Sequence, residues 1–143
     1  MEPERRYWLG VVSRDHVQRG VALGIAQIGH GTKAGLMRLR PGDGFVYYSP
    51  REGLGSGAAI RAFTAVGTVA DTPPWQADEG DFKPWRRAVE YVPDVCEIPI
   101  DELRATLDLT RRPNWGYQLR RGLVPITHAD FEHIRDAMTG GVQ

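Results

Sequence analysis

Short runs of aromatic and β-branched residues follow one another closely along this chain, and glycine or proline separates most of them. Such runs predict strands, and the residues between them predict turns. Gly67 is expected to mark a bulge or bend in the longest run. Because strands outnumber helices, we expect an α+β domain with a curved, barrel-like sheet of mixed strands flanked by short helices. The predicted strands are 7–12, 25–28, 44–49, 60–70, 85–92, 95–98 and the short extended piece 123–126.

The helices expected from the sequence are short. They cover 17–23, 36–39, 100–103 and the segment after Thr127, and 117–121 is expected to be a turn of helix or a loop. Ser13 or Asp15 can cap the first of them, and Gly24 can end it. Thr127 is expected to cap the last one, whose buried stripe is predicted to be Phe131, Ile134 and Met138. The glycine-rich segment 51–57 is expected to be a flexible loop.

The 143 residues match the size of one domain, so 1–143 is expected to be a single domain. The formal net charge is +0, and the charge of the whole chain therefore indicates no particular partner. Of the 18 Lys and Arg residues, only Lys33 and Lys83 are lysines. Arginine suits bidentate contacts to phosphate and stacking on flat rings. A codon bias towards G and C explains the same excess, so both interpretations stay open.

Several kinds of site are not indicated by the sequence. Cys96 is the only cysteine, which fits a reducing cytoplasm, and it is expected to be a small buried or edge residue. The four histidines are scattered without the spacing of zinc ligands. The amino terminus lacks the apolar stretch of a secretory signal, and no run approaches the ~18 apolar residues of a membrane helix. We therefore expect a cytoplasmic protein with no metal, no cofactor and no membrane contact.

Catalytic motifs are missing as well. Ser13, Asp15 and His16 are close in sequence, but a serine between a strand and a polar turn more simply begins a helix. No nucleophile elbow surrounds it. The segment 53–57 lacks the Gly-Lys-Ser/Thr ending of a phosphate-binding loop. No catalytic residue is predicted.

Trp115 lies in a different setting from the other large rings. The segment 111–121, Arg-Arg-Pro-Asn-Trp-Gly-Tyr-Gln-Leu-Arg-Arg, carries four arginines and no acid around it. A ring that stacks on a base, next to arginines that hold phosphates, is what recognition of a single-stranded or flipped base requires. The alternative is a tryptophan that plugs the end of the barrel while the arginines are solvated.

The order of several short motifs resembles a known family, the EVE domains, which belong to the PUA-like pseudobarrels together with the YTH and ASCH domains. The resemblance covers about residues 5–138, and no single motif is diagnostic. The motifs are Tyr7-Trp8, Ser13-Arg-Asp-His-Val17, Gln27-Ile-Gly-His-Gly31, Met37-Arg-Leu-Arg-Pro-Gly-Asp43, Tyr47-Tyr-Ser-Pro50, Phe63-Thr-Ala-Val-Gly67, Pro84-Trp-Arg-Arg87, Pro113-Asn-Trp-Gly116 and Asp130-Phe131.

This resemblance implies a mixed barrel-like sheet with a pocket at its face, and a nucleic-acid-binding module that reads a modified base of DNA or RNA there. The YTH relatives bind a methylated adenine in an aromatic cage. The chain departs from many EVE members at Ser13-Arg-Asp-His16, where they often have a segment rich in Arg and Asn. The modified base and the choice between DNA and RNA therefore stay open.

In the implied fold the residues expected at the base pocket are Ser13, Gln27, His30, Tyr47 or Tyr48, and Trp115. Alternation along a strand sends the two tyrosines to opposite faces, so only one of them can line the pocket. The residues expected to contact phosphate are Lys33, Arg120 and Arg121. A small enzyme acting on a nucleotide in the same pocket and a protein-interaction domain are the alternatives, and the oligomeric state stays open.

Overall fold

A computed structural model describes residues 4–28, 31–53 and 56–140 of the chain. Its centre is a curved mixed sheet, in which β1 (Tyr7–Val11) lies between β3 (Gly44–Gly53) and β8 (Leu123–Ile126). The main path of the sheet continues from β3 through β4 (Ser56–Val69) and β6 (Trp85–Tyr91) to β2 (Ile25–Ala26). Strands β1 and β3 are parallel, and the other pairs are antiparallel. Two short strands complete it: β5 (Trp75–Gln76) beside β6 and β7 (Ile98–Pro99) beside β4.

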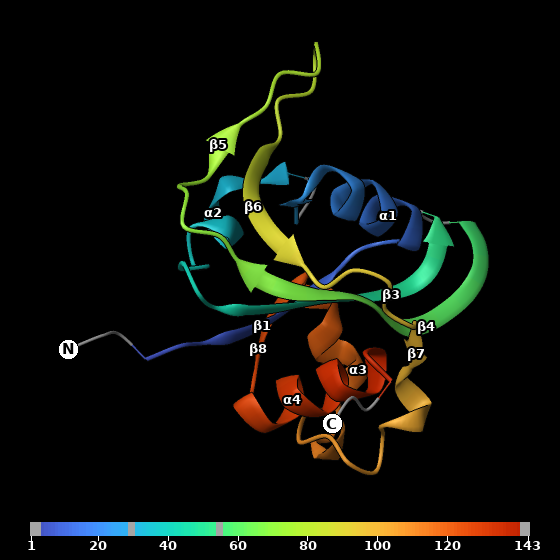
Figure 1. Cartoon of the computed structure of the whole chain (residues 1–143). Coiled ribbons are helices and arrows are strands. Elements are labelled where there is room, and N and C mark those ends of the chain that lie inside the picture. The colour runs from blue at the N-terminus through green and yellow to red at the C-terminus, as the bar shows by residue number, and fades with distance from the viewer. Residues whose placement is uncertain (1–3, 29–30, 54–55, 141–143) are drawn as a thin grey trace.

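Helices lie on both sides of the central strands (Figure 1). On one side lie α1 (Arg14–Leu23) and α2 (Lys33–Leu36), together with β6. On the other side lie α3 (Trp115–Gln118) and α4 (His128–Met138). Short 3-10 turns at Ile100–Glu102, Leu109–Arg111 and Leu119–Arg121 connect this second layer. The expected α+β architecture, a curled sheet with short flanking helices, is confirmed.

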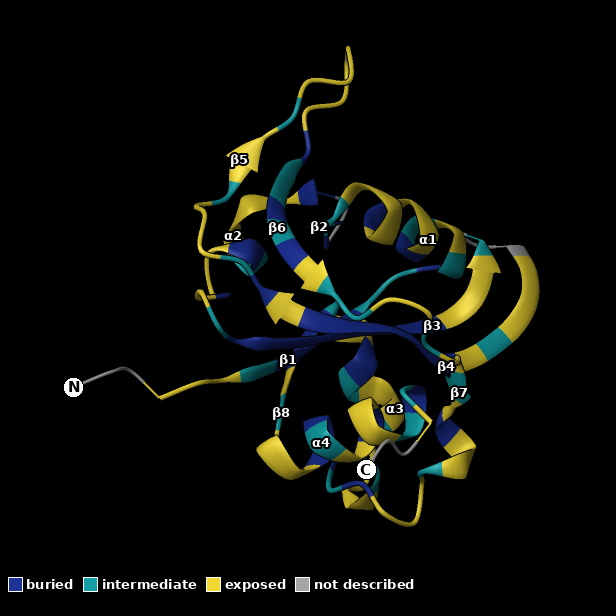
Figure 2. Cartoon of the chain, in the orientation of Figure 1, coloured by how far each residue is buried: buried dark blue, intermediate teal, exposed yellow. Residues whose placement is uncertain are grey.

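Two apolar cores lie on the two faces of this sheet, because neighbouring residues of a strand point to opposite faces. Trp8 of β1 and Tyr47 of β3 belong to the core beneath α1 and α2. Leu9 of β1 and Tyr48 of β3 belong to the core beneath α3 and α4. The middle of both strands is buried on both faces (Figure 2), which explains why their sequences are almost continuously apolar.

The hairpin of β3 and β4 corrects the prediction for its segment. Arg51–Gly53 and Ser56–Gly57 belong to strands rather than to a flexible loop, while Leu54 and Gly55 lie outside the described residues. The pairing of the two strands shifts at three places towards the tip of the hairpin, between Tyr47 and Gly53.

The pairing of β3 and β4 is regular at Gly67, so the prediction of a bulge at this residue is wrong. A Cβ atom on Gly67 would lie 2.5 Å from the carbonyl oxygen of Glu90, and the glycine therefore permits close approach of β6.

Local signals in the sequence placed several boundaries correctly. Gly24 ends α1 with a φ of 70°, and the Thr127 side chain accepts a hydrogen bond from the Asp130 amide at the start of α4. The expected apolar stripe of α4 is buried. The prediction of a strand over 95–98 is wrong, since only Ile98 of this segment is in a strand. Cys96, which was expected to be a buried or an edge residue, is exposed. The elements predicted at 17–23 and 25–28 occur as Arg14–Leu23 and Ile25–Ala26. The helical turn predicted at 36–39 is displaced, since the helix is Lys33–Leu36 and shares only Leu36 with it.

Candidate functional site

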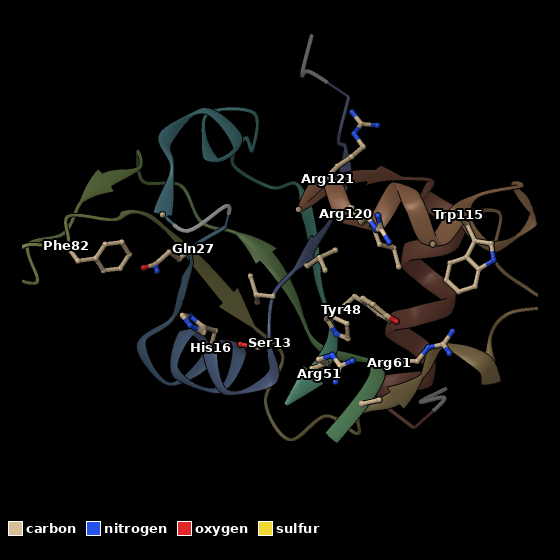
Figure 3. Close-up of a pocket in the computed structure, with 18 residues that line it drawn as sticks. Ser13, His16, Gln27, Tyr48, Arg51, Arg61, Phe82, Trp115, Arg120 and Arg121 are labelled. Carbon is tan, nitrogen blue, oxygen red and sulfur yellow. The ribbon is translucent and has the colours of Figure 1, made fainter. Parts of the chain in front are cut away.

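A pocket of about 790 Å³ opens between the two layers where β1 ends and the β3–β4 hairpin begins (Figure 3). One wall comes from the start of α1 and from the residue after β2, and the opposite wall comes from α3 and the turn that follows it. The end of β1 and the edge of β3 lie between these walls. Phe82, from the loop between β5 and β6, lies at the far end of the pocket from Trp115. The volume is within the ~300–1,000 Å³ that is usual for small-molecule sites.

The wall on the α1 side presents three polar side chains, those of Ser13, His16 and Gln27. Ser13 occupies the N-cap position of α1, as predicted, and its hydroxyl donates to the Asp15 carboxylate at 2.6 Å rather than capping a backbone amide. That bond is the main reason why the pKa of Asp15 is lowered. Gln27 follows β2, and its amide oxygen accepts a hydrogen bond from Nε of Arg86 at 3.1 Å.

The structure distinguishes the two tyrosines. Tyr47 is buried in the core, where its hydroxyl accepts from the backbone amide of Gln27 at 3.0 Å and donates to the carbonyl of the same residue at 3.2 Å. Burial raises the pKa of this phenol to about 12. Tyr47 therefore supports the segment that carries Gln27 and does not line the pocket, whereas Tyr48 does. Burial also raises the pKa of Tyr48, and the Arg61 guanidinium opposes that shift.

Trp115 begins α3 and lines the pocket opposite Gln27 (Figure 3). It is half-buried, because part of the side chain packs against the core beneath α3 and α4. The Arg104 guanidinium lies 5.3 Å from the centre of its ring. The two interpretations drawn from the sequence thus each describe part of this residue, since it contributes to a core and also faces the cavity.

Four arginines line the pocket, and two of them were not anticipated. Arg120 and Arg121 come from the turn after α3, as the basic segment predicted. Arg51 and Arg61 come from the β3–β4 hairpin. Arg51 lies in the segment predicted to be a loop, and Arg61 lies in a predicted strand where nothing in the sequence indicated a site. The run Pro50-Arg-Glu-Gly53 follows an almost continuously apolar stretch and is compatible with the end of a strand, but the glycines after it favoured a loop.

The charge at this pocket differs from that of the whole chain. None of the described residues that line it is acidic, although the complete chain has equal numbers of acids and bases. Glu52, the neighbour of Arg51, pairs instead with Arg14 at 3.6 Å, and Arg14 also bonds Glu97. A neutral protein thus presents a locally positive cavity, and such a cavity attracts anionic ligands.

Arg61 holds an uncommon backbone conformation. Its φ is 51°, in the left-handed region that non-glycine residues seldom occupy inside a strand. Between Ser49 and Arg51 the β3 strand advances by two residues, while β4 advances by three, from Ala59 to Ala62. Arg61 therefore lies in a bulge, and bulges redirect side chains at the edges of sheets. Arg61 accordingly lines the pocket although its neighbour Ala62 is buried.

Two further predicted residues are not placed at the pocket. Lys33 begins α2, and its ammonium lies over the Trp85 ring at 4.7 Å from the centroid, outside the pocket lining. The expectation that it contacts phosphate in this site is therefore not supported. His30 lies outside the described residues. The structure brings together the remaining predicted residues around one cavity: Ser13, Gln27, Tyr48, Trp115, Arg120 and Arg121.

The described parts of the chain contain neither a cluster of metal-binding side chains nor a helix suited to span a membrane. No group of three or more His, Cys, Asp or Glu side chains is gathered there in the way that a metal ion requires. Over the same residues, the helices are too short or too polar to cross a bilayer.

Comparison with known proteins gives a consistent match over most of the chain. The family described as EVE domain matches residues 6–137. A UPF0310 protein of Renibacterium salmoninarum is 52% identical over 134 residues, which cover 93% of this chain and 95% of that protein. A UPF0310 protein of Mesorhizobium japonicum is 47% identical over 136 residues, covering 92% of this chain and 91% of the relative.

Solved structures show the same fold at low sequence identity. The NMR structure of Rpa0253 from Rhodopseudomonas palustris has a TM-score of 0.63 and 15% identity, and the match covers 96% of this chain and 95% of that one. The crystal structure of Atu2648 from Agrobacterium tumefaciens has a TM-score of 0.53 and 14% identity, with 90% of each chain covered. These matches show that other proteins of very different sequence share the fold of this chain.

Proposed function

Because the chain belongs to the EVE domain family, we propose that it is a nucleic-acid-binding module that takes a single modified base into the pocket beside Trp115. Tyr48 and Trp115 supply flat rings, and the four pocket arginines hold the phosphates next to the base. The modification distinguishes the ligand from ordinary nucleic acid, and the protein acts as a reader of that base.

The observation that supports this proposal most is the difference in charge between the pocket lining and the whole chain. Arg51, Arg61, Arg120 and Arg121 face one cavity without an acidic lining residue in the part of the chain that the structure describes, in a protein of net charge +0. Arginine-lined grooves with a stacking ring favour single nucleic-acid strands. Phosphate contacts supply affinity, and the groups that touch the base edge supply discrimination.

A small enzyme in the same pocket is the alternative class. Hydrolysis by general acid and base catalysis requires two positioned proton-transfer groups. Among the described lining residues, the imidazole of His16 and the phenol of Tyr48 are the groups suited to proton transfer, and burial raises the pKa of Tyr48, which keeps its phenol protonated at neutral pH. The lining therefore favours binding over turnover, and the same assay can test both.

The experiment is a binding screen of the purified protein against single-stranded and duplex oligonucleotides, each with and without one modified base. The proposal predicts that one modified oligonucleotide binds more tightly than its unmodified twin, and that the ligand is recovered unchanged by mass spectrometry. Equal affinity for every modified and unmodified pair would remove the reading function. A changed mass would move the protein to the enzyme class.

A further inference from the structure

Among the described residues that line the pocket, Gln27 is the one with a side-chain amide, and its hydrogen bond to Arg86 determines how that amide is oriented. Arg86 of β6 donates from Nε to the Gln27 side chain at 3.1 Å. A guanidinium has donors only, so the atom that meets it must be the amide oxygen. Arg86 is in turn held by an ion pair with Glu79. This bond fixes the orientation of the amide, and the NH₂ group is the end that can donate a hydrogen bond to a ligand.

Ser13 presents a hydroxyl group on the same wall, and a neighbouring side chain determines whether this hydroxyl can donate or accept a hydrogen bond from a ligand. Its hydroxyl bonds Asp15 at 2.6 Å. That bond and the approach of positive groups lower the pKa of Asp15, so the carboxylate is ionised at neutral pH and can only accept. The single hydroxyl hydrogen of Ser13 is committed to Asp15. Lone pairs of its oxygen therefore remain to accept from a ligand.

We infer that the pocket reads its ligand through one donor and one acceptor, the NH₂ group of Gln27 and the oxygen of Ser13, and that Arg86 and Asp15 are the positioning residues that set this polarity. This inference rests on the proposed function. The matching ligand is a base edge that places a hydrogen-bond donor beside an acceptor, such as an amino group beside a ring nitrogen, or a ring N–H beside a carbonyl oxygen. An edge with acceptors alone leaves Ser13 without a donor and is disfavoured.

A first experiment needs no ligand. It measures, by ¹⁵N relaxation, how far the side-chain NH₂ group of Gln27 is ordered in the free protein, with the exposed Gln18 of α1 as reference. We expect Gln27 to be ordered and Gln18 mobile. Arg86→Met should make Gln27 as mobile as Gln18, whereas Arg86→Lys, which still has only donors, should keep much of the order. A Gln27 amide that is mobile in the parent, or unchanged in Arg86→Met, overturns the inference.

A second experiment measures selectivity on single-stranded heptamers whose central position is cytosine, 5-methylcytosine, adenine, N6-methyladenine, thymine or an abasic site. Arg86→Met should reduce the preference for the best base over the abasic site about tenfold, because the amide can then turn its oxygen to the ligand. Arg86→Lys should restore most of it. Arg111→Met is the control for loss of an arginine, because Arg111 is exposed, pairs with Asp108 and is not a lining residue.

The two experiments separate the inference from the proposed function. Failure of the parent to bind any heptamer contradicts the nucleic-acid proposal, and the relaxation measurement still decides whether Arg86 orients Gln27. Binding with a preference that Arg86→Met leaves intact contradicts the inference alone. Glu79→Gln weakens the ion pair that holds Arg86 and gives a milder variant if Arg86→Met fails to fold. It should show a smaller loss in the same direction in both assays.

Discussion

Trp115 packs against the core beneath α3 and α4 and also lines the pocket. The basic segment 111–121 drew attention to it from sequence alone, but whether it packs or binds could not be settled by composition. The arrangement depends on where α3 docks on the sheet. The choice between Tyr47 and Tyr48 has the same origin: alternation separates the two side chains, while the covering helices decide which face becomes core and which borders a cavity.

Replacing Trp115 separates its two roles. Trp115→Ala should weaken oligonucleotide binding by ~1–3 kcal/mol, the usual value for a stacked base, while the protein stays folded. Isothermal titration calorimetry and urea unfolding measure the two effects. Trp75→Ala is the control, because Trp75 is 40% exposed on β5 and is not a lining residue. Undiminished binding by Trp115→Ala would assign the ring to the core alone.

Gln27→Leu tests the base-edge contact directly. Leucine is close in size but cannot form hydrogen bonds, so the ligand edge would be buried without a partner and binding should fall by ~1–3 kcal/mol. Arg86 keeps its ion pair with Glu79, and the free energy of unfolding should change by no more than ~1 kcal/mol. Titration calorimetry on the parent and the variant measures the first value. If Gln27→Leu binds as the parent does, Gln27 is only a solvated residue beside the strand.

Tyr47 makes stability depend on pH in the alkaline range. Its pKa is raised from 10.0 to about 12 by burial, so above pH 10 the unfolded chain releases the proton while the folded protein keeps it. Raising the pH therefore favours unfolding, and stability should be lost progressively as the pH rises from 10 to about 12. Urea unfolding at several pH values in this window should show a smaller decrease for Tyr47→Phe than for the parent. Equal decreases would show that other groups, such as the buried Tyr91, account for it.

The β3–β4 hairpin illustrates what the sequence could predict at the scale of elements. Strand β1, the helix stop at Gly24 and the cap at Thr127 depend on neighbouring residues, and their local signals were sufficient. The extension of both strands beyond Ser49 depends on pairing across the hairpin, and its glycines predict a loop. For this reason Arg51 was missed. Arg61 lies in a strand that was predicted, but the bulge that brings it to the pocket depends on the same pairing.

Arg61 offers a test in which stability and binding change in opposite directions. Its φ of 51° costs roughly 1 kcal/mol for a residue with a Cβ atom and little for glycine. Arg61→Gly should therefore be more stable than Arg61→Ala by about that amount. Both variants should weaken binding to a single-stranded oligonucleotide equally, since both remove the charge. Thermal unfolding and calorimetry provide the two values. An alanine variant as stable as the glycine variant would contradict the proposed strain.

At the scale of the whole molecule, the curled sheet separates two cores and leaves a cavity where their coverings diverge. The chain has no net charge, so the attraction of an anion has to arise from the placement of arginines rather than from their number. Composition could not predict that four arginines line one cavity. Nor could it predict that Glu52 pairs with Arg14 and does not line that cavity. Both depend on contacts between segments that are distant in sequence.

The salt dependence of oligonucleotide binding tests the central claim most directly. If the pocket arginines contact phosphates, log K falls linearly with log salt, with a slope of about −0.7 for each phosphate contacted on a single strand. Arg51→Gln and Arg61→Gln should each make the slope shallower by up to about that amount. Arg111→Gln should leave it unchanged, because Arg111 is an exposed residue outside the pocket lining that pairs with Asp108. We expect a measurable slope that becomes shallower only when a pocket arginine is replaced. An affinity independent of salt, or a slope that Arg111→Gln reduces as much as the pocket variants do, would contradict the contact between pocket arginines and phosphate.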